Sequence, residues 1–131
     1  MKYKKKLATI DTQDALIGNR AYDLASLIDD VRFKSNKKLK DRIYNYYAKL
    51  NNKKINKVTL LNDFEILSVL RNMKIIGIFT RLAIRDNKTK YLKLIPYSWK
   101  LIELRIKNNE IFHKLKSLLD LNFTKKIRNL K

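Results

Sequence analysis

The sequence has no cysteine, one histidine, one proline and two glycines, and each scarcity excludes a class of protein. Without cysteine there is no disulfide framework, thiolate metal site or thiol nucleophile. The single histidine, His113, cannot form a multi-histidine metal site, and we expect it to be a partly exposed helix residue. Because so few glycines and prolines cannot provide the many tight turns of an all-β protein, a mainly α-helical fold is favoured.

Long uninterrupted apolar runs are also missing. The most apolar segment, residues 66–84, is interrupted by Arg71, Lys74 and Arg81, which predicts a helix buried on most sides rather than a membrane span. The first residues, MKYKKKLATI, are basic but lack the apolar run of a secretory signal. With 45% apolar and 33% charged residues the chain is globular. We expect one domain over residues 1–131, in the cytoplasm and without a membrane partner.

Acidic residues are scarce, since 12 Asp and Glu stand against 31 Lys and Arg, for a net charge of +19. Such a charge is typical of proteins that bind nucleic acid through its phosphates. Here the lysines are spread along most of the chain rather than gathered on one stripe, and the abundant Lys, Asn and Ile all have AT-rich codons. We therefore attribute the charge to base composition and do not expect nucleic acid as a partner. A small basic helical nucleic-acid-binding protein remains the alternative function.

The spacing of apolar residues predicts one short strand followed by helices. Residues 5–11 are expected to form a strand, or the remnant of a hairpin, that ends at Asp11. Asn19 and either Ser35 or Asn36 are expected N-caps, and Pro96 is expected in a first helical turn. Helices are predicted over residues 19–32, 37–50, 58–85, 96–107 and 110–121, with a frayed tail after them.

The same pattern predicts which side chains are buried. Apolar positions nearly encircle the long helix from Phe64 onward, which is typical of the central helix of a bundle. Tyr22, Leu24 and Leu27 are expected in the core. Tyr91 and Trp99 are also expected there rather than in the wall of a pocket.

The candidate for chemistry is a carboxylate at the end of the predicted strand. Asp11 ends this strand, and Asp14 lies three residues later. In sites that handle phosphate, Mg²⁺ is held by one or two carboxylates together with phosphate oxygens and water. Asp11 stands where such a ligand would be placed, although this spacing of two acids alone is common by chance.

A longer string around these acids is more specific. The segment IDTQDALIGNRAYDLASLIDDVR (10–32) resembles the pattern IDFQDA-x-IG-x-x-x-YDL-x-SLL-x-D-x-R of the aminoglycoside phosphotransferase/choline kinase-like superfamily. The closest likeness is to its bacterial amino-sugar kinases, which act on N-acetylmuramate or N-acetylglucosamine. The later segment KYLKLIPYSWKLIELRI (90–106) resembles RYL-x-x-LPR-x-W-x-x-LE of the same family. The two segments occur in the family's order.

The resemblance implies a role for each matching acid. Asp11 would bind the Mg²⁺ that bridges the β- and γ-phosphates of ATP. Asp14 is a weaker candidate that would act through a metal-bound water or would cap the loop. Asp23 would be a structural anchor that accepts hydrogen bonds from the backbone of the catalytic loop. The implied reaction is transfer of the ATP γ-phosphoryl group to a sugar hydroxyl, so ATP and a small sugar acceptor would be the partners.

Two departures from the family pattern limit this expectation. Thr12 replaces the usual Phe, which would pack beneath the metal-binding loop. The family's catalytic loop, H-x-D-x-x-x-x-N, should precede the metal-binding Asp, but only ten residues precede Asp11. The chain therefore carries no catalytic-loop Asp and no nucleotide-binding lobe. We expect it to be the helical C-terminal, acceptor-binding part of a kinase-like fold and inactive alone, the product of a split gene, a late internal start or a truncation. A third reading is a non-catalytic partner that completes a separately encoded N-terminal lobe.

Overall fold

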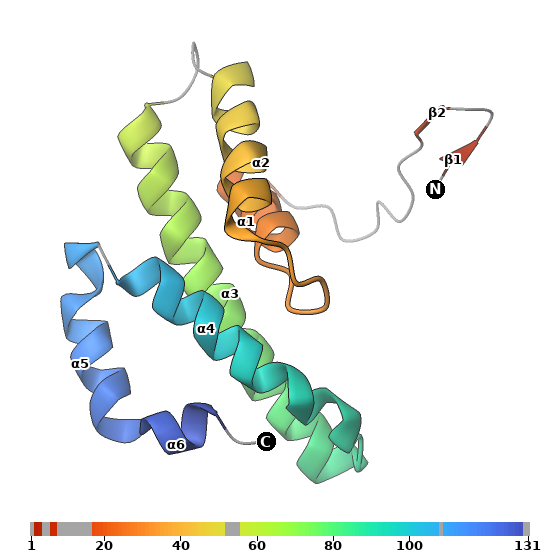
Figure 1. The fold of residues 1–131 in the computed structure, drawn as a ribbon, viewed down its shortest axis with the longest axis vertical. Helices are drawn as coiled ribbons and strands as arrows, with labels where there is room; N and C mark the ends of the chain where they lie inside the picture. The colour runs from red at the N-terminus through yellow and green to blue at the C-terminus, as the bar shows by residue number, and fades with distance from the viewer. Residues whose placement is uncertain (1, 4–5, 8–16, 52–55, 108, 130–131) are drawn as a thin grey trace.

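The computed structural model describes residues 2–3, 6–7, 17–51, 56–107 and 109–129 of the chain. The described part is mainly helical, as the sequence predicts. Helix α3 runs through the length of the molecule, with α1 and α2 packed beside its first half and α4 running back along its second half (Figure 1). The helices are α1 (Ala21–Ile28), α2 (Lys37–Leu50), α3 (Lys57–Asp86), α4 (Ile95–Ile106), α5 (His113–Asn122) and α6 (Lys125–Arg128), with 3₁₀ helices η1 (Thr89–Leu94) and η2 (Glu110–Phe112).

Two very short strands lie near the N-terminus. Strand β1 (Lys2–Tyr3) pairs with β2 (Lys6–Leu7) in antiparallel fashion, with Lys2 opposite Leu7 and Tyr3 opposite Lys6. The predicted strand was placed at residues 5–11, and residues 8–16 lie outside the described part of the chain. Its extension to Asp11 therefore stays a prediction.

Local sequence signals set the ends of α2 and α3. Asn36 is the N-cap of α2, and its side chain accepts the Leu39 N–H at 2.9 Å, as predicted. Asn56 caps α3 in the same way through Val58. Asn87 ends α3 in the left-handed region, at φ 53°, a conformation that Asn tolerates better than most residues.

The prediction for α1 was too long by one turn. The expected helix ran to Arg32, but α1 ends at Ile28. The reason is Asp29, whose side chain is fully buried and bonded to residues from three other helices. The carboxylate continues the inward stripe of Ala21 and Ala25, and its donors from the other helices hold the backbone at the point where α1 ends.

Helix α4 begins as predicted, with Pro96 in its first turn. The prediction of a frayed tail was wrong, because residues 125–128 form α6. Thr124 caps this helix, and Arg128 holds it to the rest of the molecule through Glu103 of α4 and Asp120 of α5. These ion pairs join residues 25 and 8 positions apart, which is beyond the three- and four-residue spacing of a helix, so the helical pattern did not reveal them.

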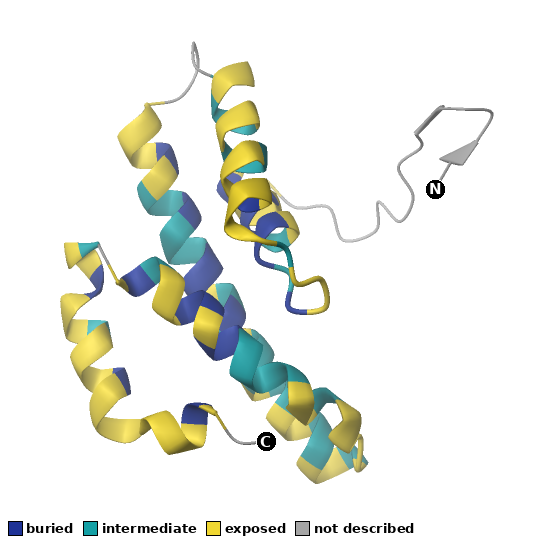
Figure 2. Cartoon of the chain, viewed as in Figure 1, coloured by how far each residue is buried: buried dark blue, intermediate teal, exposed yellow. Residues whose placement is uncertain are grey.

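The core consists of two apolar clusters on opposite halves of α3, and Figure 2 shows the buried residues following this helix and α4. The first cluster joins α1 and α2 to Leu60 and Phe64 of α3. The second joins Val69 of α3 to α4, η2 and α5, and it contains Trp99, as predicted. Tyr91 is half-buried and stacks on Phe79, with ring centroids 5.2 Å apart.

Three burial predictions were wrong. Tyr22 and Leu27, expected in the core, are 42% and 65% exposed because α3 and α2 cover only one side of α1. Helix α3 is not covered all round either, since Leu70 is 55% exposed and Ile84 is 78% exposed. Leu24 is buried as expected.

Candidate functional site

The structure describes one of the three predicted site acids. Asp11 and Asp14 lie outside the described residues, so their roles stay predictions. Asp23 lies in the first turn of α1, where a carboxylate interacts favourably with the helix dipole. It is exposed, and within the described part of the chain no hydrogen bond reaches its carboxylate. Asp23 is therefore accessible to a donor from elsewhere.

The residues that lead from the predicted metal-binding segment into α1 are anchored to α3. Asn19 accepts the Ala21 N–H through Oδ1 at 2.9 Å, which is the capping contact expected of it at the helix start. Its Nδ2 donates to Oδ2 of Asp63 on α3 at 2.7 Å. One side chain thus fixes both the start of α1 and the position of this start on the long helix.

The best-defined polar site of the described residues is the carboxylate of Asp29. Its Oδ1 accepts from Nζ of Lys40 at 2.8 Å and from Nη2 of Arg105 at 3.1 Å. Its Oδ2 accepts from Oγ of Ser68 at 2.6 Å and from Nε of Arg105 at 2.8 Å. The donors come from α2, α3 and α4, so this carboxylate, which we call the Asp29 site together with these three donors, joins four helices.

Electrostatics keep Asp29 ionised despite its burial. Burial alone raises the pKa of a carboxyl group, but here the hydrogen bond and charge of Arg105, with the bonds from Lys40 and Ser68, outweigh it and lower the pKa of Asp29. The guanidinium of Arg105 also lies over the ring of Phe64, 4.6 Å from its centroid. Lys40 donates a second bond to the carbonyl of Ile28 at 2.5 Å.

The Asp29 site is suited to holding the fold rather than to catalysis. Each carboxylate oxygen already accepts two protein donors, which leaves no lone pair for a metal or a substrate proton. The buried Lys40 and the partly buried Arg105 together outweigh its negative charge. Within the described ranges, no three His, Cys, Asp or Glu side chains lie close enough together to hold a metal ion. The described residues thus supply no magnesium cluster of their own.

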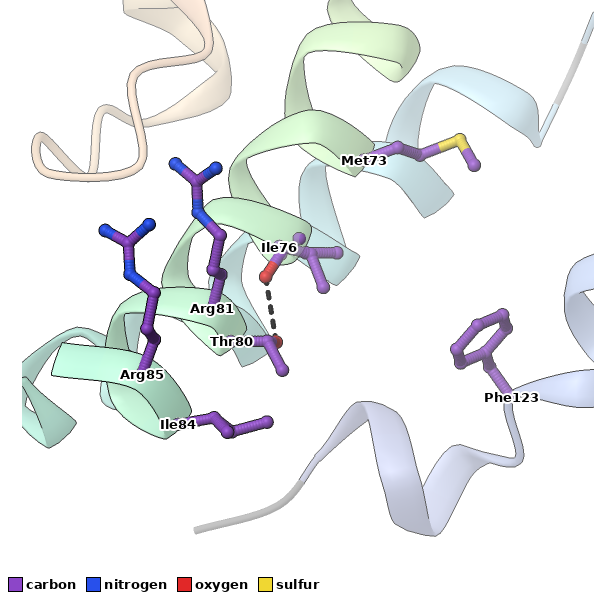
Figure 3. Close-up of a pocket in the computed structure, with 8 residues that line it drawn as sticks. Met73, Ile76, Thr80, Arg81, Ile84, Arg85 and Phe123 are labelled. Atoms are coloured by element: carbon purple, nitrogen blue, oxygen red, sulfur yellow. Dashed lines mark hydrogen bonds between the residues drawn. The ribbon is translucent and has the colours of Figure 1, made fainter. Parts of the chain in front are cut away.

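Two cavities lie at the far end of the helix pair α3 and α4. One, of about 540 Å³, is lined by Phe123 and by residues of α3, both apolar ones and Thr80, Arg81 and Arg85. Figure 3 shows Met73 and Ile84 directed toward the side where Phe123 lies, whereas the two arginine side chains extend away from Phe123. The other, of about 630 Å³, lies between the start of α4 and α6 and includes Lys93 and Lys100. Neither cavity is lined by a carboxylate or by a residue of α1.

Sequence reasoning missed the Asp29 site, although one signal was available. Asp29 follows Ala21 and Ala25 at four-residue intervals, which places it on the buried stripe of α1. A charged residue in such a position needs a buried partner. The partners Lys40, Ser68 and Arg105 lie 11, 39 and 76 residues away in sequence, so the pattern did not identify them.

Comparisons with known proteins relate the chain to kinases. No protein-family model and no solved structure matches it. Among curated proteins it resembles N-acetylmuramate/N-acetylglucosamine kinases from Caulobacter vibrioides (29% identity over 94 residues), Neisseria meningitidis (35% over 92) and Pseudomonas aeruginosa (30% over 116). These matches cover 72%, 66% and 84% of this chain but 26%, 28% and 34% of the relatives. The chain is thus similar to amino-sugar kinases over about a third of their length or less.

In the described residues no helix is long and apolar enough to cross a membrane.

Proposed function

We propose that this chain forms the acceptor-binding, C-terminal part of an ATP-dependent amino-sugar kinase and contributes the magnesium-binding carboxylate of Asp11. The observation that supports this most is the similarity to three kinases that share one printed activity. The substrates would be ATP and N-acetylmuramate or N-acetylglucosamine, and the reaction would transfer the γ-phosphoryl group to a sugar hydroxyl.

The proposal assigns a separate task to each acid. Asp11 would bind Mg²⁺, which neutralises charge on the phosphates, and Asp14 would act through a metal-bound water. Asp23 would accept hydrogen bonds from the catalytic-loop backbone, and its exposed position on α1 is compatible with this. Residues 17–20, anchored through Asn19 to Asp63, would keep the metal-binding segment at a fixed distance from α3.

Phosphoryl transfer also needs groups that this chain does not contain. Its sequence includes no H-x-D-x-x-x-x-N loop and no glycine-rich phosphate loop. Because catalysis of this reaction rests on positioning nucleotide, metal and acceptor together, we expect the 131-residue chain alone to be inactive. A nucleotide-binding lobe, which these 131 residues do not include, would complete the enzyme.

The test joins this chain to a nucleotide-binding lobe. In the Pseudomonas aeruginosa kinase, the matched region is replaced by residues 1–131, and phosphorylation of N-acetylglucosamine and N-acetylmuramate is measured with ATP and Mg²⁺. Asp11→Asn should reduce turnover at least about 100-fold and Asp14→Asn about 10-fold, since groups that act through a bound ligand cost less than the ligand itself. Asp41→Asn, at an exposed acid of α2, is the matched control.

Three results would contradict the proposal. The first is a folded chimera that binds ATP but phosphorylates neither sugar. The second is turnover that Asp11→Asn leaves unchanged. The third is Mg²⁺-dependent turnover by the 131-residue chain on its own, which would show that it does not depend on another lobe.

A further inference from the structure

Helix α1 is unusually apolar for a helix that is covered on one side. Six of its eight residues are apolar, and it contains neither Lys nor Arg. Ala21, Leu24 and Ile28 face the first core cluster, whereas Tyr22 and Leu27 point outward and are 42% and 65% exposed. A helix that is apolar on nearly all sides is normally buried on all sides.

The charge of α1 also differs from that of the other helices. Lys and Arg make up 31 of the 131 residues, but residues 7–31 include a single basic residue, Arg20. The same 25 residues hold five of the chain's 12 acids. Each of the other α-helices carries an exposed lysine, namely Lys37, Lys57, Lys100, Lys114 and Lys125. The outer face of α1, formed by Tyr22, Asp23 and Leu27, is thus an apolar and acidic surface on a strongly basic protein.

We propose that the outer face of α1 is the docking surface for the nucleotide-binding lobe of the kinase. This inference rests on the proposed function and names the surface of this chain to which the nucleotide-binding lobe binds. The matches cover 34% or less of each relative, so about two thirds or more of each relative lies outside the matched region. We expect that further polypeptide to pack on this part. Tyr22 and Leu27 supply the apolar contact, and the accessible carboxylate of Asp23 accepts hydrogen bonds from the partner.

Charge favours this occupant over a nucleic acid or an anionic membrane. Both are polyanions, and they would bind the lysine-bearing α-helices rather than α1, which among the α-helices of the described residues is the one without Lys or Arg. The carboxylate in the first turn of α1 would repel a phosphate. A protein surface with apolar side chains and hydrogen-bond donors would match both the exposed Tyr22 and Leu27 and the carboxylate of Asp23.

The experiment measures binding in trans, independently of kinase activity. The probe is the Pseudomonas aeruginosa kinase polypeptide without its matched region, used once ATP binding shows that it is folded. It is titrated into the full 131-residue chain by calorimetry. Leu27→Asp should raise the dissociation constant at least about tenfold, and Tyr22→Ser should raise it to a similar degree. Leu118→Asp is the matched control, because Leu118 is 57% exposed on α5, and it should change the constant less than about twofold.

Hydrogen exchange gives a second readout with the same probe. Binding should protect the amides of α1 more than those of α5. Because Leu27 and Leu118 are both largely exposed, both variants should keep the wild-type melting curve, which separates a docking defect from unfolding.

The outcomes separate the two proposals. Absence of binding, or equal effects of the Leu27 and Leu118 substitutions, would overturn the docking surface. So would a self-associated chain that Leu27→Asp converts to monomer, because the face would then serve a second copy. Binding at α1 with no turnover in the chimera would leave the docking surface standing and reject the kinase function. If the chimera turns over and Leu27→Asp leaves its turnover unchanged, the kinase function would be supported and the docking surface would be rejected.

Discussion

The substitution Asp29→Asn tests whether the Asp29 site holds the helices together. Asparagine keeps the shape of the side chain but removes its charge. Lys40 and Arg105, which are 5% and 13% exposed, would then be left near the core without a counter-charge. Removing one partner of a buried ion pair costs about 3–5 kcal/mol, because the remaining charge is desolvated without compensation.

That cost is large compared with the stability of a small domain. Total free energies of unfolding are about 5–15 kcal/mol, so a loss of about 3–5 kcal/mol in Asp29→Asn should remove at least about a fifth of the stability. For a chain of this length 1 kcal/mol corresponds to about 3 °C, which predicts a melting temperature about 10–15 °C lower. Circular dichroism at 222 nm against temperature and urea measures both quantities.

The adjacent acid provides a matched control. Asp30 pairs with Arg32 on the surface, where the Arg32 side chain is 74% exposed. An exposed pair of this kind contributes less than about 1 kcal/mol, so Asp30→Asn should have little effect. If Asp29→Asn destabilised the protein no more than Asp30→Asn, the reasoning would be refuted. The combined substitution Asp29→Leu, Lys40→Met and Arg105→Met should recover stability relative to Asp29→Asn, because no unpaired charge remains.

The lowered pKa of Asp29 adds a pH dependence with a defined sign. Because the carboxyl titrates at lower pH in the folded chain than in the unfolded one, its contribution is fully present above the ordinary value of 3.8. It is lost as the pH falls through the folded value. Wild-type stability should therefore fall below about pH 4 more steeply than that of Asp29→Asn, and parallel pH curves would contradict the assignment.

Three further predictions concern local structure. Asn36→Ala removes the side-chain acceptor at the start of α2 and should lower the free energy of unfolding by about 1 kcal/mol in urea, so an unchanged midpoint would show that the cap is dispensable. Asn87→Ala should cost about 1–2 kcal/mol and Asn87→Gly nothing, because only the alanine is strained at a φ of 53°; equal stabilities would refute this. Arg128→Met breaks two ion pairs and the contact with Trp99, so the fluorescence of Trp99 should shift to the red and amide exchange in α6 should rise, whereas Lys126→Met, at an exposed position of α6, should change neither.

Sequence reasoning succeeded where the signal was local. The bounds of α2 and the role of Asn36 follow from a cap and a regular apolar spacing, both contained in neighbouring residues. The end of α1 did not follow, because it depends on Asp29 reaching Lys40, Ser68 and Arg105 across the fold. Helix α6 was missed for the same reason, since Arg128 holds it by distant acids.

The candidate site divides in the same way. Asp11 and Asp14 were singled out by a string of neighbouring residues, and both stay predictions because they lie outside the described part of the chain. The exposure of Tyr22 and Leu27 contradicted the predicted burial of these residues. The apolar pattern indicates only that a side chain prefers to be buried. The pattern does not state which polypeptide provides the covering surface.

The position of the Asp29 site also determines how the molecule unfolds. A single carboxylate accepts donors from α2, α3 and α4 at the end of α1, so none of these four helices can separate without breaking a shared bond. They should therefore open as one cooperative unit, while α5 and α6, which lie outside it, open at lower free energy. Amide exchange would then show two levels of protection. The amides of α1, α2, α3 and α4 would share the slower level, although Leu24 in α1 and Ile102 in α4 are far apart in sequence.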